Sequence, residues 1–565
     1  MQVQASVAEW LEIGGLRQAL GDRHICYNVR FPSPMTKDPM TQEIRKTKFE
    51  YLYSQWASKP VDGRLWKAIL QISLVLLCGC QNDPAGDFTD VGEPTETWDV
   101  IYAGGSKIGH AHTMIQPVSI GAGDRQGVRI TSEQHLAVKR FGQVTRQSLS
   151  ITSLETTDGQ VLAFDTSYTA GKESALTSGK YDAEAKKFVL STRTKGKTVE
   201  SSMFWDKEWG GFLAIDQSLA DEPMKPRESR TLQAFQPILN QTGKVKLKAA
   251  EYEETQLLGE TKKLLRINVS IVIRTQSIKQ TIWVDRRGNT LKSEMPGIGF
   301  LSYRTTKEVA SRQSGEPSFD LGEKSIVKVD RELDNAHRTK KIVYKAHVKD
   351  GDLKDVFATG PSQSVKLIDD DTAEITVVAI RQNQPETIDV KVAKPTSADF
   401  TANNMIQSDD IAIVHMSRFV RHDDTDAWRV AKDLESYVNE KIKNVNFSTA
   451  FATASEVAES LEGDCTEHAV LLAALCRARD IPARVAMGLV YFHGKSGPGF
   501  AYHMWTEVWT KDRWVPLDAT LGLGGIGAGH IKMAHSNLKG ADAYSAFLPV
   551  IQVMGRLELE IVEVN

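Results

Sequence analysis

The sequence predicts a multidomain protein in which mainly antiparallel β domains precede a C-terminal module of mixed helices and strands. Three observations predict this fold class. The 565 residues are enough for about three or four domains of ordinary size. Short alternating runs of apolar and polar residues, separated by turn residues, dominate residues 97–308. After about Asp399, apolar residues recur instead with helical spacing.

The composition excludes several classes of protein. Lys and Arg number 69 and Asp and Glu 72, so the net charge of −3 excludes a strongly basic nucleic-acid binder. With 41% hydrophobic and 25% charged residues, the chain has the composition of a folded globular protein. The five cysteines are too few for a disulfide-stapled scaffold, and they are Cys26, Cys78, Cys80, Cys465 and Cys476.

An apolar stretch near the N-terminus resembles a bacterial lipoprotein signal. Arg64 and Lys67 precede residues 68–77, which are too few to span a bilayer but suit the apolar core of a signal peptide. The next residues complete a run that resembles the lipobox, with leucine three positions before a cysteine and a small residue directly before it: Leu77-Cys78-Gly79-Cys80.

The lipobox resemblance implies an anchored protein. It implies a signal over residues 64–80 and lipidation of Cys80, which then becomes the first mature residue. The protein would be held at a membrane by this lipid anchor, in the cell envelope, facing the periplasm or the surface. Residues 81–96 are polar and rich in Gly, Pro and Asp, so we expect a flexible tether.

The position of this signal is unusual, because a signal peptide begins near the first residue. Residues 1–63 are therefore a doubtful N-terminal extension, and Val61 or Leu65 is the expected translation start. The alternative is a short buried helix at residues 66–78 in a cytoplasmic protein.

Residues 97–318 are predicted to form one antiparallel β domain. Strand–turn–strand signals lie at residues 100–109, 157–164 and 280–292, each around a glycine-containing turn. Many such runs without a helical pattern between them favour a large antiparallel sheet or half-barrel. Because no residues there have a catalytic spacing, we expect a binding or positioning role.

The small β domain is predicted at residues 319–395, with strands at residues 340–348 and 372–380. The C-terminal module then covers residues 396–565. Helices are expected at residues 410–420, 425–442 and 454–461, and Asp424 or Thr425 is expected to cap the second of them.

Cys465 lies in the densest local signal of the chain. Asp464 and Glu467 fit a capping box, which makes Cys465 the first residue of a helix. Unpaired N–H groups and the helix dipole at that end favour the thiolate, which is the nucleophilic form of cysteine. Cys476 continues an apolar face of the same helix and is expected in the core, too far away for a disulfide.

A histidine and a carboxylate follow at positions suited to support a thiolate. Residues 483–492 are predicted to form a strand, and the glycine-rich residues 493–500 a mobile loop. Residues 502–509 and 514–518 then form a hairpin, in which His503 and Asp518 are direct or diagonal cross-strand neighbours. A carboxylate that holds a histidine ring completes a catalytic triad.

Four short motifs together resemble the transglutaminase-like superfamily. In order they are Gly463-Asp464-Cys465, Ile481-Pro482-Ala483-Arg484, His503-Met504-Trp505-Thr506-Glu507-Val508, and Trp514-Val515-Pro516-Leu517-Asp518-Ala519-Thr520. The resemblance covers about residues 400–540 and differs from the family in Ala519-Thr520, where Pro-Thr is common. It implies an α+β, papain-like core with the cysteine on a central helix packed against a sheet that carries the histidine and the aspartate.

The resemblance also implies an activity. Cys465 would be the nucleophile, His503 the general base and acid, and Asp518 the orienting carboxylate, in acyl transfer on protein or peptide amide bonds. Resolution by an amine gives a cross-link and resolution by water gives hydrolysis, and the sequence leaves both open. No cofactor or metal ion is expected.

Other interpretations of these residues remain open. Cys465 fits a buried structural cysteine, or a zinc ligand together with His468 and His503, although a fourth ligand is missing. His468 and Trp505 are candidates for the substrate cleft. The glycine-rich residues 522–529 suggest a flexible loop before a last strand near residues 530–533. The competing function is a surface-anchored, non-enzymatic binding protein that keeps the fold.

Overall fold

The computed structural model describes residues 88–121, 125–170, 174–313, 315–380, 388, 390–421, 423–447, 451–494 and 497–565. The chain divides into two compact units, residues 1–82 and 83–565, and every described residue belongs to the second. The predicted extension over residues 1–63, the signal over residues 64–80 and the lipidation site Cys80 lie outside the described residues. No helix among the described residues is long and apolar enough to span a membrane.

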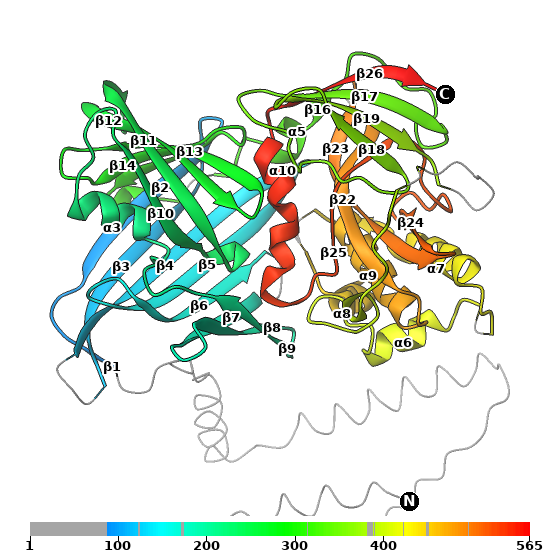
Figure 1. Cartoon of the computed structure of the whole chain (residues 1–565), viewed down its shortest axis with the longest axis horizontal. Helices are drawn as coiled ribbons and strands as arrows, with labels where there is room; N and C mark the ends of the chain where they lie inside the picture. Colours follow the sequence, from blue (N-terminus) through cyan, green and yellow to red (C-terminus); the bar gives the residue numbers. More distant parts are fainter. Residues whose placement is uncertain are drawn as a thin grey trace, which may run out of the picture. The chain divides into compact units, whose positions relative to one another are not determined.

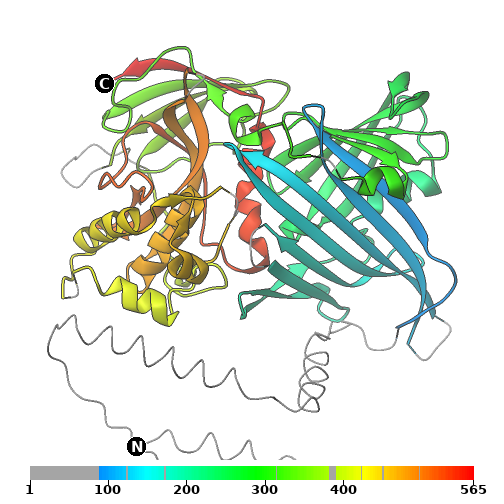
Figure 2. The same ribbon diagram turned by 180° about the vertical axis from the view of Figure 1, so that it is seen from behind.

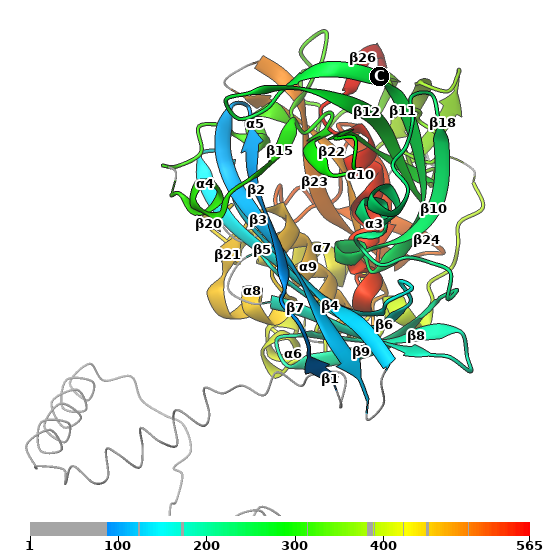
Figure 3. The ribbon, with the colours of Figure 1, turned by 90° about the vertical axis from the view of Figure 1, so that its left-hand side faces the viewer.

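The first part of the described chain is one antiparallel sheet, as predicted (Figure 1). Fourteen of its fifteen described strands follow the order β10-β11-β12-β13-β14-β15-β2-β3-β4-β5-β6-β7-β8-β9, and the fifteenth, β1, pairs with β3. The strands are β1 (Phe88–Asp90), β2 (Thr95–Ala103), β3 (Ser106–Ile120), β4 (Arg125–Arg140), β5 (Gln143–Thr156), β6 (Val161–Thr169), β7 (Ser174–Asp182), β8 (Lys187–Thr194), β9 (Lys197–Phe204), β10 (Ser229–Gln236), β11 (Gln241–Gln256), β12 (Thr261–Ile273), β13 (Gln276–Val284), β14 (Thr290–Met295) and β15 (Phe300–Thr305). Figure 3 shows the long strands β2 to β5 side by side in a strongly twisted sheet.

Local sequence explains the hairpins of this sheet. Gly104 and Gly105 both have positive φ, 54° and 81°, and connect β2 to β3 through the tight turn that a two-residue hairpin requires. The predicted hairpins β5–β6 and β13–β14 are also present. The tether predicted over residues 81–96 is wrong for residues 88–90 and 95–96. Phe88 packs onto an apolar cluster and its strand β1 pairs with β3, and β2 already starts at Thr95.

Short helices connect or cover these strands. They are α3 (Ala214–Asp221), η2 (Pro237–Leu239), α4 (Lys307–Ser311) and α5 (Leu321–Lys324), whereas η3 (Ser397–Asp399) precedes the C-terminal helices. Near the C-terminus, η4 (Gly540–Phe547) and α10 (Leu548–Val553) return to the large sheet. Leu548 and Ala541 are buried in two of its apolar clusters, and Figure 1 shows α10 beside the sheet.

A second sheet has the strand order β18-β19-β17-β26. Its strands are β17 (Lys341–Val348), β18 (Gln363–Leu367), β19 (Thr372–Val378) and β26 (Leu557–Val564). Strands were predicted at residues 340–348 and 372–380, and both are present. The sheet is completed by β26, which pairs with β17 from more than 200 residues away. The predicted strand near residues 530–533 exists but is not the last one.

The helices of the C-terminal part are α6 (Ile411–Ser417), α7 (Ala427–Lys441), α8 (Ala454–Ser460) and α9 (Cys465–Arg477). They pack into one apolar core with the inner face of a third sheet. That sheet contains β16 (Val327–Lys328), β22 (Ala483–Gly494), β23 (Gly497–Thr510), β24 (Arg513–Leu517) and β25 (His530–Ser536). A short parallel pair, β20 (Asn444–Val445) and β21 (Glu462–Gly463), lies before α9. Figures 1 and 2 show these helices below β22 and β23 and the second sheet above them.

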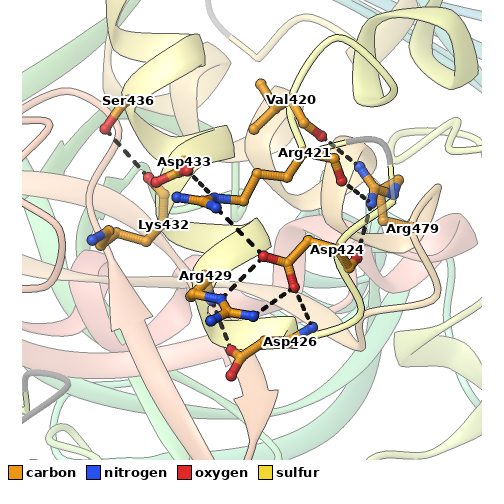
Figure 4. Close-up of polar contacts among 9 residues, drawn as sticks. All are labelled: Val420, Arg421, Asp424, Asp426, Arg429, Lys432, Asp433, Ser436 and Arg479. Atoms are coloured by element: carbon orange, nitrogen blue, oxygen red, sulfur yellow. Dashed lines mark hydrogen bonds and ion pairs between the residues drawn. The ribbon is translucent and has the colours of Figure 1, made fainter.

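Three local predictions need correction. The cap of α7 is Asp426, which accepts a hydrogen bond from Arg429 N, whereas Asp424 instead binds the Arg429 and Arg421 side chains (Figure 4). Helix α9 is buried on all sides from Glu467 to Arg477. Cys476 therefore lies in the core, but the buried surface of the helix is not restricted to the one apolar face that the sequence predicts. The sequence predicts a mobile loop at residues 493–500. The described residues of this range belong to strands instead, because β22 continues to residue 494 and β23 starts at residue 497.

Candidate active site

Cys465 is the first residue of α9, and the capping of this helix sets its position. The Asp464 side chain accepts a hydrogen bond from Thr466 N at 2.9 Å, and the Glu467 side chain accepts one from Asp464 N at 2.9 Å. This is the capping box that the sequence predicts. Gly463 has a φ of 152°, and a Cβ atom there would lie 2.3 Å from the Glu467 side chain. Glycine is therefore required immediately before the cap.

His503 lies on a free part of the β23 edge. Strand β16 pairs with residues 499 and 500, and β24 pairs from Thr506 onwards, so between them the described residues provide no strand on this side. Helix α9 packs against β23, and hydrogen bonds to the His503 side chain and to the Met504 backbone lower the pKa of Cys465. The start of α9 therefore lies beside the histidine.

Asp518 directly follows β24 and contacts His503, as predicted. The register pairs Thr506 with Leu517, which makes His503 a diagonal neighbour of Asp518. The Nε2 atom of His503 lies 2.8 Å from Oδ2 of Asp518, and the two side chains are 8% and 1% exposed. Since Nε2 is used in this bond, Nδ1 is the ring nitrogen left for Cys465.

Electrostatics in this pair favour an imidazolium. Burial alone would lower the pKa of His503, but the charges of Asp518 and Cys465 and the hydrogen bonds to them outweigh burial and hold that pKa well above its usual value. Burial raises the pKa of Asp518, but His503 and His530 outweigh burial and hold that pKa far below its usual value. The pair is thus an ionised carboxylate facing a readily protonated ring.

The Cys465 thiol differs from the sequence-based expectation. Burial raises its pKa and the charge of Asp464 raises it further, whereas His503 and the Met504 N–H lower it. Burial and the capping carboxylate of Asp464 therefore act against the helix end, which the sequence predicts to favour the thiolate. Among the groups that act on this thiol, His503 and the Met504 N–H are those that favour the thiolate.

Sequence reasoning missed two residues that contact Asp518. His530, on β25, places Nε2 at 3.0 Å from the same Oδ2 atom that binds His503. Glu435, on α7, accepts a hydrogen bond from Asp518 N at 3.0 Å, and burial together with the charge of Asp518 raises the pKa of Glu435 to about 8. A glutamate inside the apolar stripe of α7 was a local signal for Glu435. No local signal in the sequence pointed to His530, because a glycine-rich segment separates it from Asp518.

Of the two cleft candidates, Trp505 lies beside the histidines. It is 2% exposed, its ring stacks at 6.4 Å from the His503 ring, and its edge-to-face contact with His530 measures 5.4 Å between centroids. His468 is buried on α9, and its Nδ1 donates to the Asp464 carbonyl at 2.7 Å. This bond ties the ring to its own helix. Their predicted roles toward substrate remain predictions.

One group of potential metal ligands occurs among the described residues, and it is not the set weighed from the sequence. It comprises His503, Asp518 and His530, whose ligand atoms all lie within 4.8 Å of one another. Cys465 and His468 are not part of it. The atoms that would bind a cation already hydrogen-bond each other in pairs, which favours a hydrogen-bonded relay over a metal centre at this position.

The large sheet also reaches this site. Arg140, the last residue of β4, donates from Nη2 to Oδ2 of Asp464 at 3.0 Å, and the Asp464 side chain is only 1% exposed. In the same hairpin, the Thr145 hydroxyl donates to the Phe447 carbonyl at 2.6 Å. The cap of the helix that carries Cys465 is thus paired with a residue 324 positions earlier in the chain.

One comparison with known proteins matches the part of the chain that contains these residues. A family model described as the transglutaminase-like superfamily matches residues 415–519, which include Cys465, His503 and Asp518. No curated protein sequence matches the chain significantly.

Similar solved structures include a candidate cysteine protease from Cytophaga hutchinsonii, with 16% identity and a TM-score of 0.25 over 40% of this chain and 85% of that chain. A beta-barrel-like protein of domain of unknown function DUF1849 from Brucella abortus has 11% identity and a TM-score of 0.27 over 38% and 97%. The periplasmic domain of TgpA from Pseudomonas aeruginosa, bound to ethylmercury, has 13% identity and a TM-score of 0.25 over 33% and 74%. Residues 415–519 of this chain, with the cysteine, histidine and aspartate that they contain, are a transglutaminase-like domain.

Proposed function

We propose that this protein catalyses thiol-dependent acyl transfer on protein or peptide amide bonds. The observation that carries the proposal is the buried His503–Asp518 pair, at 2.8 Å, beside Cys465 on the first turn of α9. A nucleophile, a proton acceptor and an orienting carboxylate are the groups that covalent acyl transfer requires.

The proposed reaction begins with proton transfer from Cys465 to His503. The thiolate sulfur attacks the carbonyl carbon of the substrate amide and forms a tetrahedral intermediate. As this intermediate collapses, the His503 imidazolium donates its proton to the departing nitrogen, and a thioester remains on Cys465. Asp518 holds the ring in the required orientation throughout.

The thioester is resolved by a second nucleophile. His503, now neutral, accepts a proton from an amine or a water molecule as it attacks the thioester carbonyl, and the Cys465 thiolate leaves. An amine gives a new amide bond, and water gives a carboxylic acid. The shape of the acceptor side decides between cross-linking and hydrolysis. A peptide screen scored for ammonia release, amine incorporation and chain cleavage tells these outcomes apart.

A thiol-reactive acylating probe tests the nucleophile. We expect rapid labelling of the wild-type protein and of Cys476→Ala, because Cys476 is fully buried and burial raises its pKa well above the usual value. Labelling of the active-site peptide should be lost in Cys465→Ala. If the wild type labels no faster than Cys465→Ala, the protein is the non-enzymatic binding protein that was the alternative interpretation.

We also propose that the protein is a lipoprotein of the cell envelope, anchored through Cys80. The support is the lipobox resemblance of Leu77-Cys78-Gly79-Cys80 after a short apolar stretch. Mass spectrometry of the mature N-terminus should find an acylated cysteine at position 80. An unprocessed chain that begins at Met1 would contradict the anchor and would favour a cytoplasmic protein.

A further inference from the structure

Asp518 is shared between two buried histidines. Oδ2 accepts from His503 Nε2 at 2.8 Å and from His530 Nε2 at 3.0 Å, and Oδ1 accepts from Thr520 N at 2.9 Å. The His530 side chain is 0% exposed. A triad needs only one histidine on its carboxylate. The second one therefore calls for a role of its own.

The construction of the sheet brings the two rings together. His503 pairs with Gly488 on β22, and on the other side of that strand His530 pairs with Val490. Directly paired residues of an antiparallel sheet project to the same face, so His503 and His530 project to one face from either side of β22. A Cβ atom at Gly488 would lie 2.0 Å from the Ile531 carbonyl oxygen, so glycine is what lets β25 approach β22 here. The ring centroids of His503 and His530 are 6.0 Å apart.

We infer that His530 is a positioning residue of the active site: its neutral ring donates a hydrogen bond to Asp518 and thereby sets the basicity and orientation of His503. This inference rests on the proposed function, because it assigns His530 a part in the same proton transfer.

The charge state of His530 follows from its surroundings. Burial lowers its pKa, although the Asp518 carboxylate opposes this effect. The other ionisable groups that face it are His503 on β23 and His337 from the segment before β17, whose ring centroid lies 5.6 Å away. Burial and the neighbouring His530 lower the pKa of His337 to about 4. Asp518 thus receives one bond from a neutral ring, His530, and one from a ring that gains and loses a proton, His503.

This division of bonds has a definite effect on His503. When His503 is neutral, Asp518 depends most on His530 for compensation of its buried charge. When His503 is an imidazolium, it compensates that charge by itself. Loss of the His530 donor therefore destabilises the state with neutral His503 more strongly, and the pKa of His503 should rise. A more basic imidazolium is also a weaker acid toward the departing amine.

The pH dependence of Cys465 alkylation by iodoacetamide measures this effect in the full chain. The rate is read from the peptide that contains Cys465, so the other cysteines do not interfere. The alkylation rate should change in an alkaline step at the pH where His503 loses its proton. In His530→Leu we expect this alkaline step to move up by about one pH unit. His530→Gln is the matched control, because its amide N–H can replace the Nε2 donor. The alkaline step of His530→Gln should therefore stay near the pH of the wild-type step.

Two results would overturn the inference. One is an alkaline step that is unmoved in His530→Leu. The other is an equal shift, or an equal loss of rate at every pH, in both variants, which would indicate a packing role alone. Thermal melting of each variant shows whether it is folded.

A measurement on the wild type keeps the inference testable if His530→Leu does not fold. NMR of ¹⁵N-labelled histidine should show His530 neutral at pH 7 and protonated at Nε2. A ring protonated only at Nδ1, or charged at pH 7, would overturn the inference. This experiment involves no thiol chemistry, so its failure is distinct from a failure of Cys465 to react, which would reject the proposed function instead.

Discussion

At the scale of single residues, a buried ionic network next to the active site shows how strongly charge compensation matters in this protein. Glu507, on β23, bonds to Lys532 Nζ at 2.6 Å and to Arg484 Nε at 2.8 Å. All three side chains are at most 11% exposed. The Arg484 guanidinium also stacks over the Trp514 ring, at 3.9 Å from its centroid. Removal of one partner leaves the others charged inside the sheet.

The ionisation of Glu507 gives stability a pH dependence. Burial raises its pKa, but the charges of Lys532 and Arg484 outweigh burial and lower that pKa from 4.5 to about 2. The folded state therefore favours the carboxylate. This contribution to stability is fully present above pH 4.5 and is lost as the pH falls toward 2.

We predict that Glu507→Gln destabilises the protein by about 3–5 kcal/mol at pH 7, because it leaves two buried cations without their partner. The difference in stability between Glu507→Gln and the wild type should narrow as the pH falls from 4.5 to 3. Thermal melting at pH 7, 4.5 and 3 measures both effects. The control is Asp512→Asn, at the exposed turn of the β23–β24 hairpin, which should change little at any pH. A gap that stays constant with pH would contradict the prediction.

At the scale of secondary-structure elements, two independent contacts position the start of α9. The capping box is local: Asp464 and Glu467 satisfy N–H groups within four residues of Cys465. The second contact comes from the β4–β5 hairpin, whose Arg140 neutralises the same Asp464 that caps the helix. Because Asp464 raises the pKa of Cys465, this arginine indirectly favours the thiolate.

Substitution of Arg140 tests this link between the large sheet and the nucleophile. In Arg140→Gln the buried Asp464 loses its counter-charge, so the pKa of Cys465 should rise by about half to one unit. Alkylation of Cys465 at pH 7 should then slow by about three- to tenfold. Arg146→Gln, at an exposed position of the neighbouring strand β5, is the matched control and should leave the rate unchanged. Equal rates in Arg140→Gln and the wild type would show that the ion pair does not affect the thiol.

At the scale of the whole molecule, segments far apart in sequence complete each sheet near the active site. β16, at residues 327–328, pairs with β23, and β26 pairs with β17. Tyr344 on β17 donates its hydroxyl proton to the Ala528 carbonyl at 2.8 Å, and its ring meets Phe500 at 5.5 Å. One apolar core therefore includes residues from both predicted C-terminal domains. Their boundary at residue 395 remains a prediction.

Two fragments test whether the small sheet and the transglutaminase-like part fold as one unit. We predict that residues 319–565 melt cooperatively and that residues 396–565 alone do not. The shorter fragment loses β16 and β17 and exposes Phe500 and other residues that are fully buried in the chain. Calorimetry and circular dichroism of both fragments measure this difference. A cooperative transition of the shorter fragment at the same temperature would show that the small sheet is dispensable.

Sequence reasoning was most accurate where the signal is local. The capping box placed Cys465 at the helix start, and the hairpin of β23 and β24 placed His503 diagonal to Asp518. Reasoning failed where a distant segment decides the structure. Residues 497–500 look like a glycine-rich loop, but Phe500 is held between Tyr344 and Tyr491, and Gly499 lies against Val327.

The sequence by itself determined that a large antiparallel β region precedes a C-terminal module of helices and strands, and it determined the transglutaminase-like motifs and the three residues proposed for catalysis. Turns, caps and hairpin registers depend on near neighbours in the chain. Only the tertiary structure decided which charges surround those residues. Arg140, Glu435 and His530 reach Asp464 or Asp518 through packing of separate elements. The pKa of a buried group depends on burial and on charges a few ångströms away, and spacing along the chain carries no record of either.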